Sequence, residues 1–456
     1  MDKFVLTSFI ILISGINSNF LRYLQPSSSN EYDYSNYKSV KSNEDLTGET
    51  LSSSTTDQSV VYITSKGITI KDSSLTKESG DSSNIENSEF YGVNSAVLVQ
   101  GGETTISGGQ ITTKAKGANA LCATNGGSVQ ISNASIKSTG SSSARGLHAT
   151  YGGTIIANDV NIITQGGSCA SLATDRGEGQ VTCTGCILMT EGAGSPLIYS
   201  TGTIILNGKS SGTASGAQMV VVEGKNTASV TNSDLNCSGK GNRNNVDKCG
   251  VMLYQSQSGD AGEGTAKFNC QSSTMEIESS SDVYSSAPMF FITNTDAEIN
   301  LNKCKFTYGS GVFLNVAGTS EWGKSGENGG DVTLNLVNQN IEGDFTVDSY
   351  SELIINMVNS TIKGTINKAK TADKLEIKMD SDSSITLTGN SYYTKLTNDD
   401  YSSNNINKGD YTFSSYGSDE DDDDDDNDDE NIPKIKTSSK YYKISLFLLI
   451  LIMASF

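Results

Sequence analysis

Charged side chains gather in four turns of the sequence that are longer and more polar than their equivalents elsewhere. The candidate ligand-binding residues in these turns are Asp175, Arg176, Glu178, Glu223, Lys225, Asp260, Glu263, Trp322 and Lys324. Two carboxylates about 5–10 Å apart can hydrolyse a glycosidic bond. An aromatic ring beside planar polar groups can instead bind a sugar without cleaving it. A third interpretation is that these are ordinary polar loops on a surface.

The sequence contains few residues suited to nucleophilic catalysis, metal binding or phosphate binding. His148 is the only histidine, so no Ser/His/Asp grouping with a supported base can be assembled. Cys183 and Cys186 form a CxxC pair without a second pair at zinc-site spacing. No phosphate-binding motif is present. We therefore assign no catalytic residue and expect no metal site and no cofactor.

Composition excludes further classes of protein. The 456 residues include 32 basic and 52 acidic side chains, which gives a net charge of -20. That balance argues against nucleic acid as a partner, because such a partner requires a basic field. No internal apolar run approaches the roughly 18 residues of a membrane-spanning helix, so a polytopic membrane protein is excluded.

Both ends of the chain have the character of targeting segments. Residues 1–18 join a basic residue, a short apolar run and small residues, which is typical of a signal peptide; a buried strand is the alternative. Residues 444–456 form an apolar tail after a polar spacer, which resembles the signal for a GPI anchor. A plain hydrophobic tail anchor is the alternative. The expected location is extracellular, at the cell surface and held at a membrane.

Two polar segments separate these ends from the body. Residues 19–58 are rich in Ser, Asn and Tyr and are expected to form a flexible leader. Residues 398–443 contain the run Asp419 to Glu430, in which 11 of 12 residues are acidic. Like charges at this density repel one another, so we expect a disordered, solvated stalk. The alternative, more specific interpretation is that this run binds divalent cations with low affinity.

The body, residues 59–397, consists of repeats. A turn position recurs at Asp72, Gly108, Asn133, Asp159, Gly185, Gly208 and Asn232, with steps of 25, 26, 26, 23 and 24 residues from Gly108 onward. All seven are residue types that tolerate a left-handed backbone. An apolar residue follows three positions later in most repeats, although Ser211 breaks that row. Another apolar row is Leu98, Leu121, Leu147, Leu172, Ile198, Val222, Leu253, Phe290 and Phe313.

Three short alternating strands in each repeat cannot bury a core alone, but stacked repeats can. We therefore predict an all-β fold, a single right-handed parallel β-helix. A β-sandwich is the alternative, although it would not need apolar positions that stay in register through nine coils. Scarce proline fits the β-helix, because central strands need every backbone N–H.

The coils resemble right-handed parallel β-helix surface proteins of the pectate-lyase-like superfamily, especially large secreted bacterial adhesin-like proteins of similar Gly/Thr/Ser-rich texture. The most distinctive segments are Ala173-Thr174-Asp175-Arg176-Gly177 and Val251-Met252-Leu253-Tyr254-Gln255-Ser256. This resemblance covers about residues 60–400 and concerns the fold rather than the activity. Many β-helix proteins are polysaccharide lyases or hydrolases. The motif set of the β-helix polygalacturonases, Asn-Thr-Asp, Asp-Asp, Gly-His-Gly and Arg-Ile-Lys, is absent.

An exported chain can carry disulfides and glycans. Cys237 and Cys249 bracket a polar insertion and are the first candidate disulfide pair. Cys183 and Cys270 fall on an inward strand row, where a free thiol can pack as a small apolar group. The candidate N-glycosylation sites are Asn133, Asn236 and Asn359. Asn133 also occupies a turn position, so a structural role competes there.

Together these features predict a non-catalytic, adhesin-like glycoprotein at the cell surface. Its expected partners are an extracellular glycan or a partner surface, and the membrane through its C-terminal anchor. The alternative is a secreted polysaccharide lyase or glycoside hydrolase that uses acidic residues of the enlarged turns.

Overall fold

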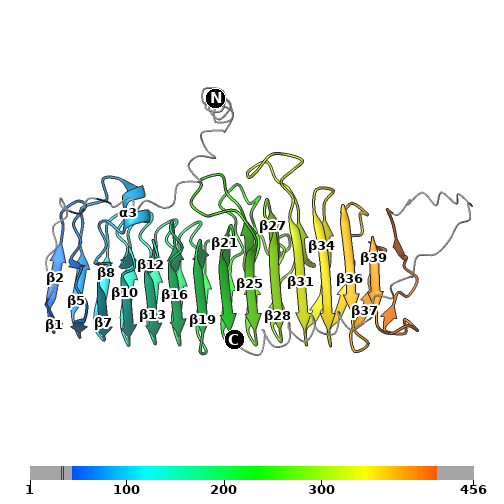
Figure 1. Cartoon of the computed structure of the whole chain (residues 1–456), viewed down its shortest axis with the longest axis horizontal. Coiled ribbons are helices and arrows are strands. Elements are labelled where there is room, and N and C mark those ends of the chain that lie inside the picture. Colours follow the sequence, from blue (N-terminus) through cyan, green and yellow to red (C-terminus); the bar gives the residue numbers. More distant parts are fainter. Residues whose placement is uncertain (1–31, 33, 35–43, 418–456) are drawn as a thin grey trace, which may run out of the picture. The chain divides into compact units, whose positions relative to one another are not determined.

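The protein forms a parallel β-helix, as predicted (Figure 1). The structure, a computed structural model, describes Tyr32, Tyr34 and residues 44–417. Successive coils place equivalent strands side by side, and their hydrogen-bonded pairs are parallel. The predicted signal peptide, the acidic run and the apolar tail lie outside the described residues.

Three long sheets run along the stack. Sheet 1 has 14 strands: β1 (Leu46–Thr47), β4 (Ile68–Lys71), β7 (Glu103–Ser107), β10 (Ser128–Ser132), β13 (Thr154–Asn158), β16 (Gln180–Thr184), β19 (Thr203–Asn207), β22 (Thr227–Thr231), β25 (Ala266–Gln271), β28 (Ala297–Asn302), β31 (Asp331–Val337), β34 (Glu352–Val358), β36 (Lys374–Met379) and β39 (Lys395–Asn398). Sheet 2 has 10 strands: β2 (Thr50–Ser53), β5 (Ser74–Lys77), β8 (Gln110–Thr113), β11 (Ser135–Ser138), β14 (Asn161–Thr164), β17 (Ile187–Thr190), β20 (Ser211–Ala214), β23 (Asp234–Cys237), β26 (Thr274–Ile277) and β29 (Lys305–Thr307).

Sheet 3 completes the wall of the solenoid. It has 11 strands: β3 (Val61–Ile63), β6 (Val97–Gln100), β9 (Leu121–Thr124), β12 (Leu147–Ala149), β15 (Leu172–Thr174), β18 (Ile198–Ser200), β21 (Val220–Glu223), β24 (Val251–Tyr254), β27 (Phe290–Thr293), β30 (Val312–Val316) and β33 (Asp344–Val347). Two short sheets serve the last coils: sheet 4 with β32 (Asn340–Glu342), β35 (Thr361–Gly364), β37 (Ser384–Leu387) and β40 (Ile406–Asn407), and sheet 5 with β38 (Ser391–Tyr393) and β41 (Phe413–Ser415).

The predicted turn residues lie between sheets 1 and 2, and all seven have a left-handed backbone, with φ between 48° and 71°. The same turn continues through Ser272, Lys303, Asn338 and Asn359, with φ of 45° to 57°. Ser and Lys rarely adopt this conformation. Their presence shows that stacking on the neighbouring coils fixes the turn even where the residue type does not favour it.

The inward rows need three corrections. Val222 and Leu253 lie in a second inward row, because Ile198 pairs with Val220 and Phe290 pairs with Val251. Leu98 faces outward, and Val97 is the residue that pairs with Leu121 in the inward row. The break predicted at Ser211 reflects a longer turn, in which both Gly208 and Lys209 have positive φ. Gly212 consequently takes the inward position beside Leu188 and Leu235. A Cβ atom there would lie 2.6 Å from Cδ1 of Leu197, so the leucine fills the space.

The solenoid extends beyond the expected limits of 59–397. Leu46, in the expected leader, is 1% exposed and pairs with Ile70. At the other end, β41 lies beyond residue 397 and pairs with β38. These outer strands are rich in Ser and Thr, and this polar composition concealed their alternation.

The cross-section narrows between β29 and β32. Sheet 2 ends at β29, and sheet 4 begins at β32 without pairing to it. Residues 114–120 link β8 to β9 in the wide part, whereas Gly343 alone links β32 to β33. Phe306 and Phe313 pack with centroids 5.4 Å apart at this step and cover the end of the wider core.

One helix, α3 (Ile85–Tyr91), lies in the connection between β5 and β6 (Figure 1). The Asn84 side chain accepts a hydrogen bond from the Glu86 N–H and so caps its first turn. Gly92 ends the helix with φ of 71°, in the left-handed conformation usual at this position.

Candidate functional site

The outer side of sheet 3 is a second packed surface. Its outward row comprises Tyr62, Leu98, Cys122, His148, Ala173, Tyr199, Val221, Met252, Phe291, Asn315 and Thr346. From Leu98 to Phe291 every member is buried except the half-buried Tyr199. The covering consists of α3 and segments 239–249, 255–264 and 317–330, which we call the roof. Two of the four enlarged turns, 255–264 and 317–330, therefore form part of the cover over sheet 3.

A charged cluster lies under the first part of the roof. Nη1 of Arg145 is 3.0 Å from Oδ2 of Asp175, and its Nη2 is 3.3 Å from Oε1 of Glu89 on α3. Burial raises the pKa of Asp175 to about 7, and the Arg145 guanidinium opposes that rise. Nε2 of His148 lies 2.6 Å from the Glu89 carbonyl oxygen. Burial and the nearby Arg145 hold the pKa of His148 well below its usual value, so the ring is neutral.

Salt bridges at the roof edge join turns that are distant in sequence. Nη2 of Arg176 is 2.7 Å from Oδ1 of Asp260, and its guanidinium lies 3.9 Å from the centre of the Phe90 ring. Nζ of Lys225 is 2.7 Å from Oε1 of Glu178. The predicted gathering of these turns on one edge is therefore present. The charges pair with one another rather than lining an open groove.

A second buried carboxylate, Glu223, is held by hydroxyl groups. Tyr254 donates to it over 2.9 Å, and Tyr199 and Ser256 also donate. Burial raises the pKa of both tyrosines well above the usual value, which keeps these donors protonated. Trp322 packs edge-on against Tyr254 with centroids 5.2 Å apart.

Trp322 does not form the predicted aromatic platform. Its side chain is 7% exposed and packs from the roof onto Val221, Met252 and Phe291 of sheet 3. Lys324 pairs with Glu327 inside its own turn, and Glu263 is exposed. The nine predicted ligand residues thus divide into buried groups, paired surface groups and isolated ones.

Sequence reasoning missed Glu89, Arg145 and the tyrosines Tyr199 and Tyr254. A signal was present, because several strands of sheet 3 are continuous apolar runs. Examples are VVV in β21 and FFI in β27, which are buried along their whole length. Such runs are typical of strands covered on both faces.

The cysteines pair differently from the prediction. Disulfides join Cys183 to Cys186 and Cys270 to Cys304, so neither Cys183 nor Cys270 is a free core thiol.

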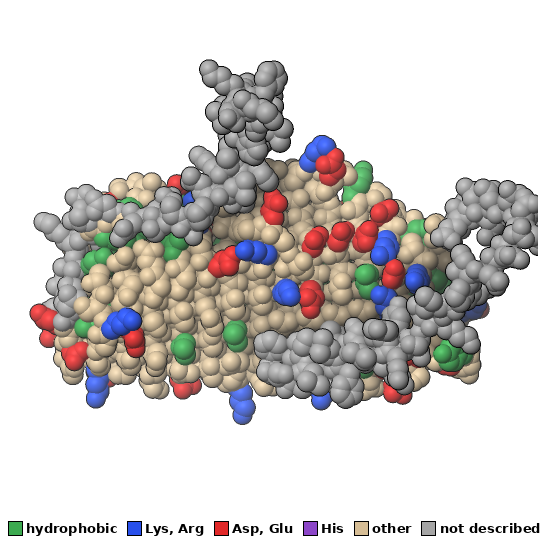
Figure 2. Space-filling view, in the orientation of Figure 1, with side chains coloured by type: hydrophobic (Ala, Val, Ile, Leu, Met, Phe, Trp, Pro, Cys, Tyr) green, Lys and Arg blue, Asp and Glu red, His purple; other side chains and the backbone are tan. Residues whose placement is uncertain are grey.

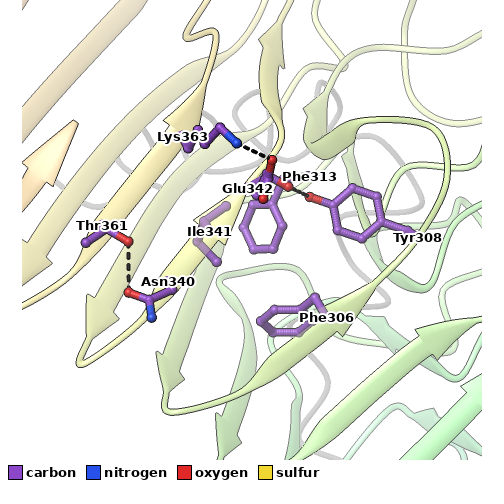
Figure 3. Close-up of a pocket in the computed structure, with 8 residues that line it drawn as sticks. All are labelled: Phe306, Tyr308, Phe313, Asn340, Ile341, Glu342, Thr361 and Lys363. Carbon is purple, nitrogen blue, oxygen red and sulfur yellow. Dashed lines mark hydrogen bonds and ion pairs between the residues drawn. The ribbon is translucent and has the colours of Figure 1, made fainter. Parts of the chain in front are cut away.

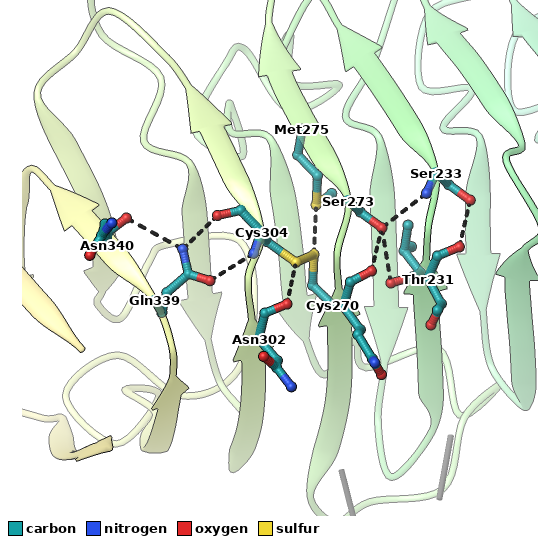
Figure 4. Close-up of a disulfide and its surroundings, with 11 residues drawn as sticks. Thr231, Ser233, Cys270, Ser273, Met275, Asn302, Cys304, Gln339 and Asn340 are labelled. Carbon is teal, nitrogen blue, oxygen red and sulfur yellow. Dashed lines mark hydrogen bonds between the residues drawn. A yellow bond between two sulfur atoms is a disulfide. The ribbon is translucent and has the colours of Figure 1, made fainter. Parts of the chain in front are cut away.

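Figure 4 shows the disulfide that ties Cys270 of β25 to Cys304 after β28. Gln339 of the next coil accepts a hydrogen bond from the Cys304 N–H and donates one to its carbonyl oxygen. Cys237 and Cys249 are both unpaired, because Cys237 faces the core whereas Cys249 packs between the roof and the outer face of sheet 3.

The three sequons lie at different places in the coils. Asn133 and Asn359 are exposed turn residues with φ of 52° and 45°. The Asn359 amide already donates to Oδ1 of Asn338 over 2.7 Å. Asn236 is half-buried on β23. Glycosylation at these sites stays a prediction.

A hollow of about 530 Å³ lies over β30 and β33, where the outward row of sheet 3 becomes polar. Its lining includes Asn315, Thr346, Asp348, Lys368 and the apolar Ala317. Both oxygens of Asp348 already accept hydrogen bonds, from the N–H groups of Gly318 and Tyr350. Asn315 uses its Oδ1 to accept from Thr346.

A smaller hollow, of about 320 Å³, lies at the step in the cross-section (Figure 3). Phe306, Tyr308 and Phe313 form its aromatic side, and Glu342 and Lys363 pair on its other side over 2.7 Å. The Tyr308 hydroxyl donates to the Glu342 carbonyl oxygen and bridges the two unpaired strands. This arrangement seals the step in place of a strand ladder.

Comparisons with protein-family models, curated proteins and solved structures find no match. Among the described residues, no cluster of three or more His, Cys, Asp or Glu side chains is placed to hold a metal ion. In residues 44–417 no helix has both the length and the hydrophobicity needed to cross a bilayer.

Proposed function

We propose that the chain is an exported, membrane-anchored surface protein whose β-helix binds an extracellular glycan or partner surface without catalysis. The proposal includes the right-handed β-helix of the pectate-lyase-like superfamily, whose adhesin-like members have repeats of similar texture. The predicted signal peptide, the acidic run and the apolar tail of the sequence support export and anchoring.

The observation that carries the non-catalytic part is the burial of the candidate carboxylates. An acid and a base of a glycosidase must contact the substrate. Asp175 is 4% exposed and bound to Arg145, and Glu223 is 1% exposed and held by three hydroxyls. A sugar cannot reach either group in this arrangement. Their contacts stabilise the roof.

The hollow over β30 and β33 is the place best suited to ligand contact. It lies at the end of the roof, and amide, hydroxyl and ammonium groups border a mainly apolar surface there. Such a mixture suits a hydroxyl-rich ligand with one apolar face. Because Asp348 is already occupied by donors, Lys368 and the Asn315 amide are left to donate to a ligand.

A glycan array probed with the full-length protein, run beside a carbohydrate-degradation screen, tests this proposal. We expect binding without turnover, and about a tenfold loss of affinity in an Asn315→Ala/Lys368→Ala variant, equal to about 1.4 kcal/mol. Lys363→Ala is the matched control, because this lysine is exposed but pairs with Glu342 at the other hollow. Turnover that Asp175→Asn or Glu223→Gln abolishes would overturn the proposal.

Membrane anchoring has its own test. Detergent-phase partitioning before and after phosphatidylinositol-specific phospholipase C should show release of the protein into the aqueous phase. Retention in the detergent phase after cleavage would contradict the lipid anchor and favour the plain hydrophobic tail.

A further inference from the structure

An aromatic strip lies at the N-terminal end of the outer face of sheet 3. Tyr62, Leu98 and Cys122 come from adjacent strands in register, and Tyr91 and Val93 approach them from the end of α3. Leu98, Cys122 and Val93 are fully buried, whereas the two tyrosines are half-buried. We call these five residues the aromatic strip.

Two tyrosines from the N-terminal segment pack on this strip. The Tyr32 ring stacks on Tyr91 with centroids 5.1 Å apart, and the Tyr34 ring stacks on Tyr62 at 5.7 Å. Tyr32 and Tyr34 meet edge to face at 4.9 Å. The Tyr34 hydroxyl donates to the Tyr91 carbonyl oxygen over 2.8 Å. The contact therefore combines ring stacking with one directional polar bond.

The strip is shaped closely around these rings. Tyr91 stacks in parallel on Tyr151, with an interplanar angle of 7°, so its face is held toward Tyr32. Gly92 lets the end of α3 approach the sheet, because a Cβ atom there would lie 2.3 Å from Sγ of Cys122. Five rings follow one another in the order Tyr62, Tyr34, Tyr32, Tyr91 and Tyr151.

We propose that the aromatic strip is a docking site for a peptide segment with two tyrosines two residues apart, and that Tyr32 and Tyr34 of the chain itself occupy it. Both rings of this spacing reach the same surface, because Tyr32 and Tyr34 meet each other and each stacks on one tyrosine of the strip. A segment with one tyrosine would lose one stack, and a segment without hydroxyls would lose the bond to the Tyr91 carbonyl.

Because Tyr32 and Tyr34 belong to the same chain as the aromatic strip, they limit the access of a separate peptide to it. A segment linked by a short connection competes at an effective concentration of about a millimolar. A separate peptide of the same chemistry must displace it, so its apparent affinity falls with the fraction of sites left free. The strip is thus a peptide site that opens when the N-terminal segment leaves or is removed.

Fluorescence anisotropy with a labelled synthetic peptide of residues 27–36 tests the proposal on the full-length chain. We expect the Tyr32→Ala/Tyr34→Ala protein to bind the probe about tenfold more tightly than the wild type, because the internal competitor is lost. Adding Tyr91→Ala to that variant should abolish the gain, with circular dichroism confirming the β-helix. Tyr37→Ala is the matched control and should leave the wild-type affinity unchanged.

A second measurement covers the case of weak peptide binding. Nitration of tyrosines with tetranitromethane, mapped by mass spectrometry, should modify Tyr62 and Tyr91 faster in the Tyr32→Ala/Tyr34→Ala protein than in the wild type. Equal probe affinities in the two proteins would overturn the proposal. An unchanged nitration rate at both tyrosines would overturn it as well. A probe with both tyrosines replaced by alanine should not bind either protein.

Discussion

The outer faces of sheets 1 and 3 belong to the same coils but have opposite character. On sheet 1 the strands alternate, and the outward row of Gln130, Ile156, Thr182 and Ile205 remains at least partly exposed. Figure 2 shows that charged side chains are sparse over much of the visible face of the molecule. On sheet 3 the equivalent outward row is apolar and buried under the roof.

The difference shows how a solenoid divides its surface. A strand that buries one face needs alternating residues, whereas a strand that buries both faces becomes an unbroken apolar run. Sheet 3 therefore required additional chain to cover it, and the enlarged turns and α3 supply that chain. Where the outward row becomes polar, at Asn315 and Thr346, the roof ends and a hollow begins.

The largest expected effect is the loss of stability when either of two neighbouring phenylalanines on β27 is replaced. Phe290 faces the inner core and Phe291 faces the roof, and each is at most 3% exposed. Replacing a core Phe by Ala typically costs about 3–5 kcal/mol. We expect both Phe290→Ala and Phe291→Ala to lower the free energy of unfolding in urea by this amount. A cost below about 1 kcal/mol for Phe291→Ala would mean that the roof is not a packed second core.

The charged cluster beneath the roof gives the next test. Arg145→Ala leaves Asp175 buried without its cation, and breaking a buried pair in this way costs about 3–5 kcal/mol. Lys225→Ala is the control, because its pair with Glu178 is about half exposed and should be worth about 0–1 kcal/mol. Equal losses in urea unfolding would contradict the distinction between covered and open charges.

The pH dependence of stability probes the same cluster. The Asp175 pKa is raised to about 7, so between roughly pH 4 and 7 the folded state holds a proton that the unfolded chain has released. This group therefore lowers stability as pH rises through that window, by at most about 1.4 kcal/mol per pH unit. His148 acts in the opposite direction below its usual pKa, because its folded-state pKa is depressed.

Comparing wild type with Asp175→Asn separates the two contributions. The wild-type minus variant difference in unfolding free energy should fall as pH rises from 4 to 7 and stay level above. A flat difference across the whole range would show that Asp175 titrates normally in the folded protein.

The smallest effect is expected on the open face. Ile156 is 41% exposed on sheet 1, so Ile156→Thr should change the unfolding free energy by no more than about 0.5 kcal/mol. The melting temperature measured by differential scanning calorimetry should be nearly unchanged. A large loss would show that this face is also packed against something, and the contrast between the sheets would fail.

The sequence predicted the β-helix because turn residues such as Asn133 and Asp159 recur with the apolar rows. It predicted that the enlarged turns meet on one edge, since equivalent turns of successive coils stack. It could not predict that Trp322 turns inward, because only the packing of Val221, Met252 and Phe291 provides its site. The partner of Asp175 was equally hidden, because Arg145 reaches it from a different coil connection and also pairs with Glu89 of α3.

The narrowing between β29 and β32 affects the order in which the coils of the β-helix unfold. Stacked coils are coupled to their nearest neighbours, so a solenoid unravels where that coupling is weakest. Across this step sheets 1 and 3 remain continuous, while sheet 2 stops after 10 strands and sheet 4 adds 4 more. One of the three ladders of backbone hydrogen bonds is missing there. Side-chain hydrogen bonds of the Tyr308 hydroxyl and the Gln339 amide link the two coils in its place. Under tension or heat, the four C-terminal coils should detach as a block before the ten that precede them.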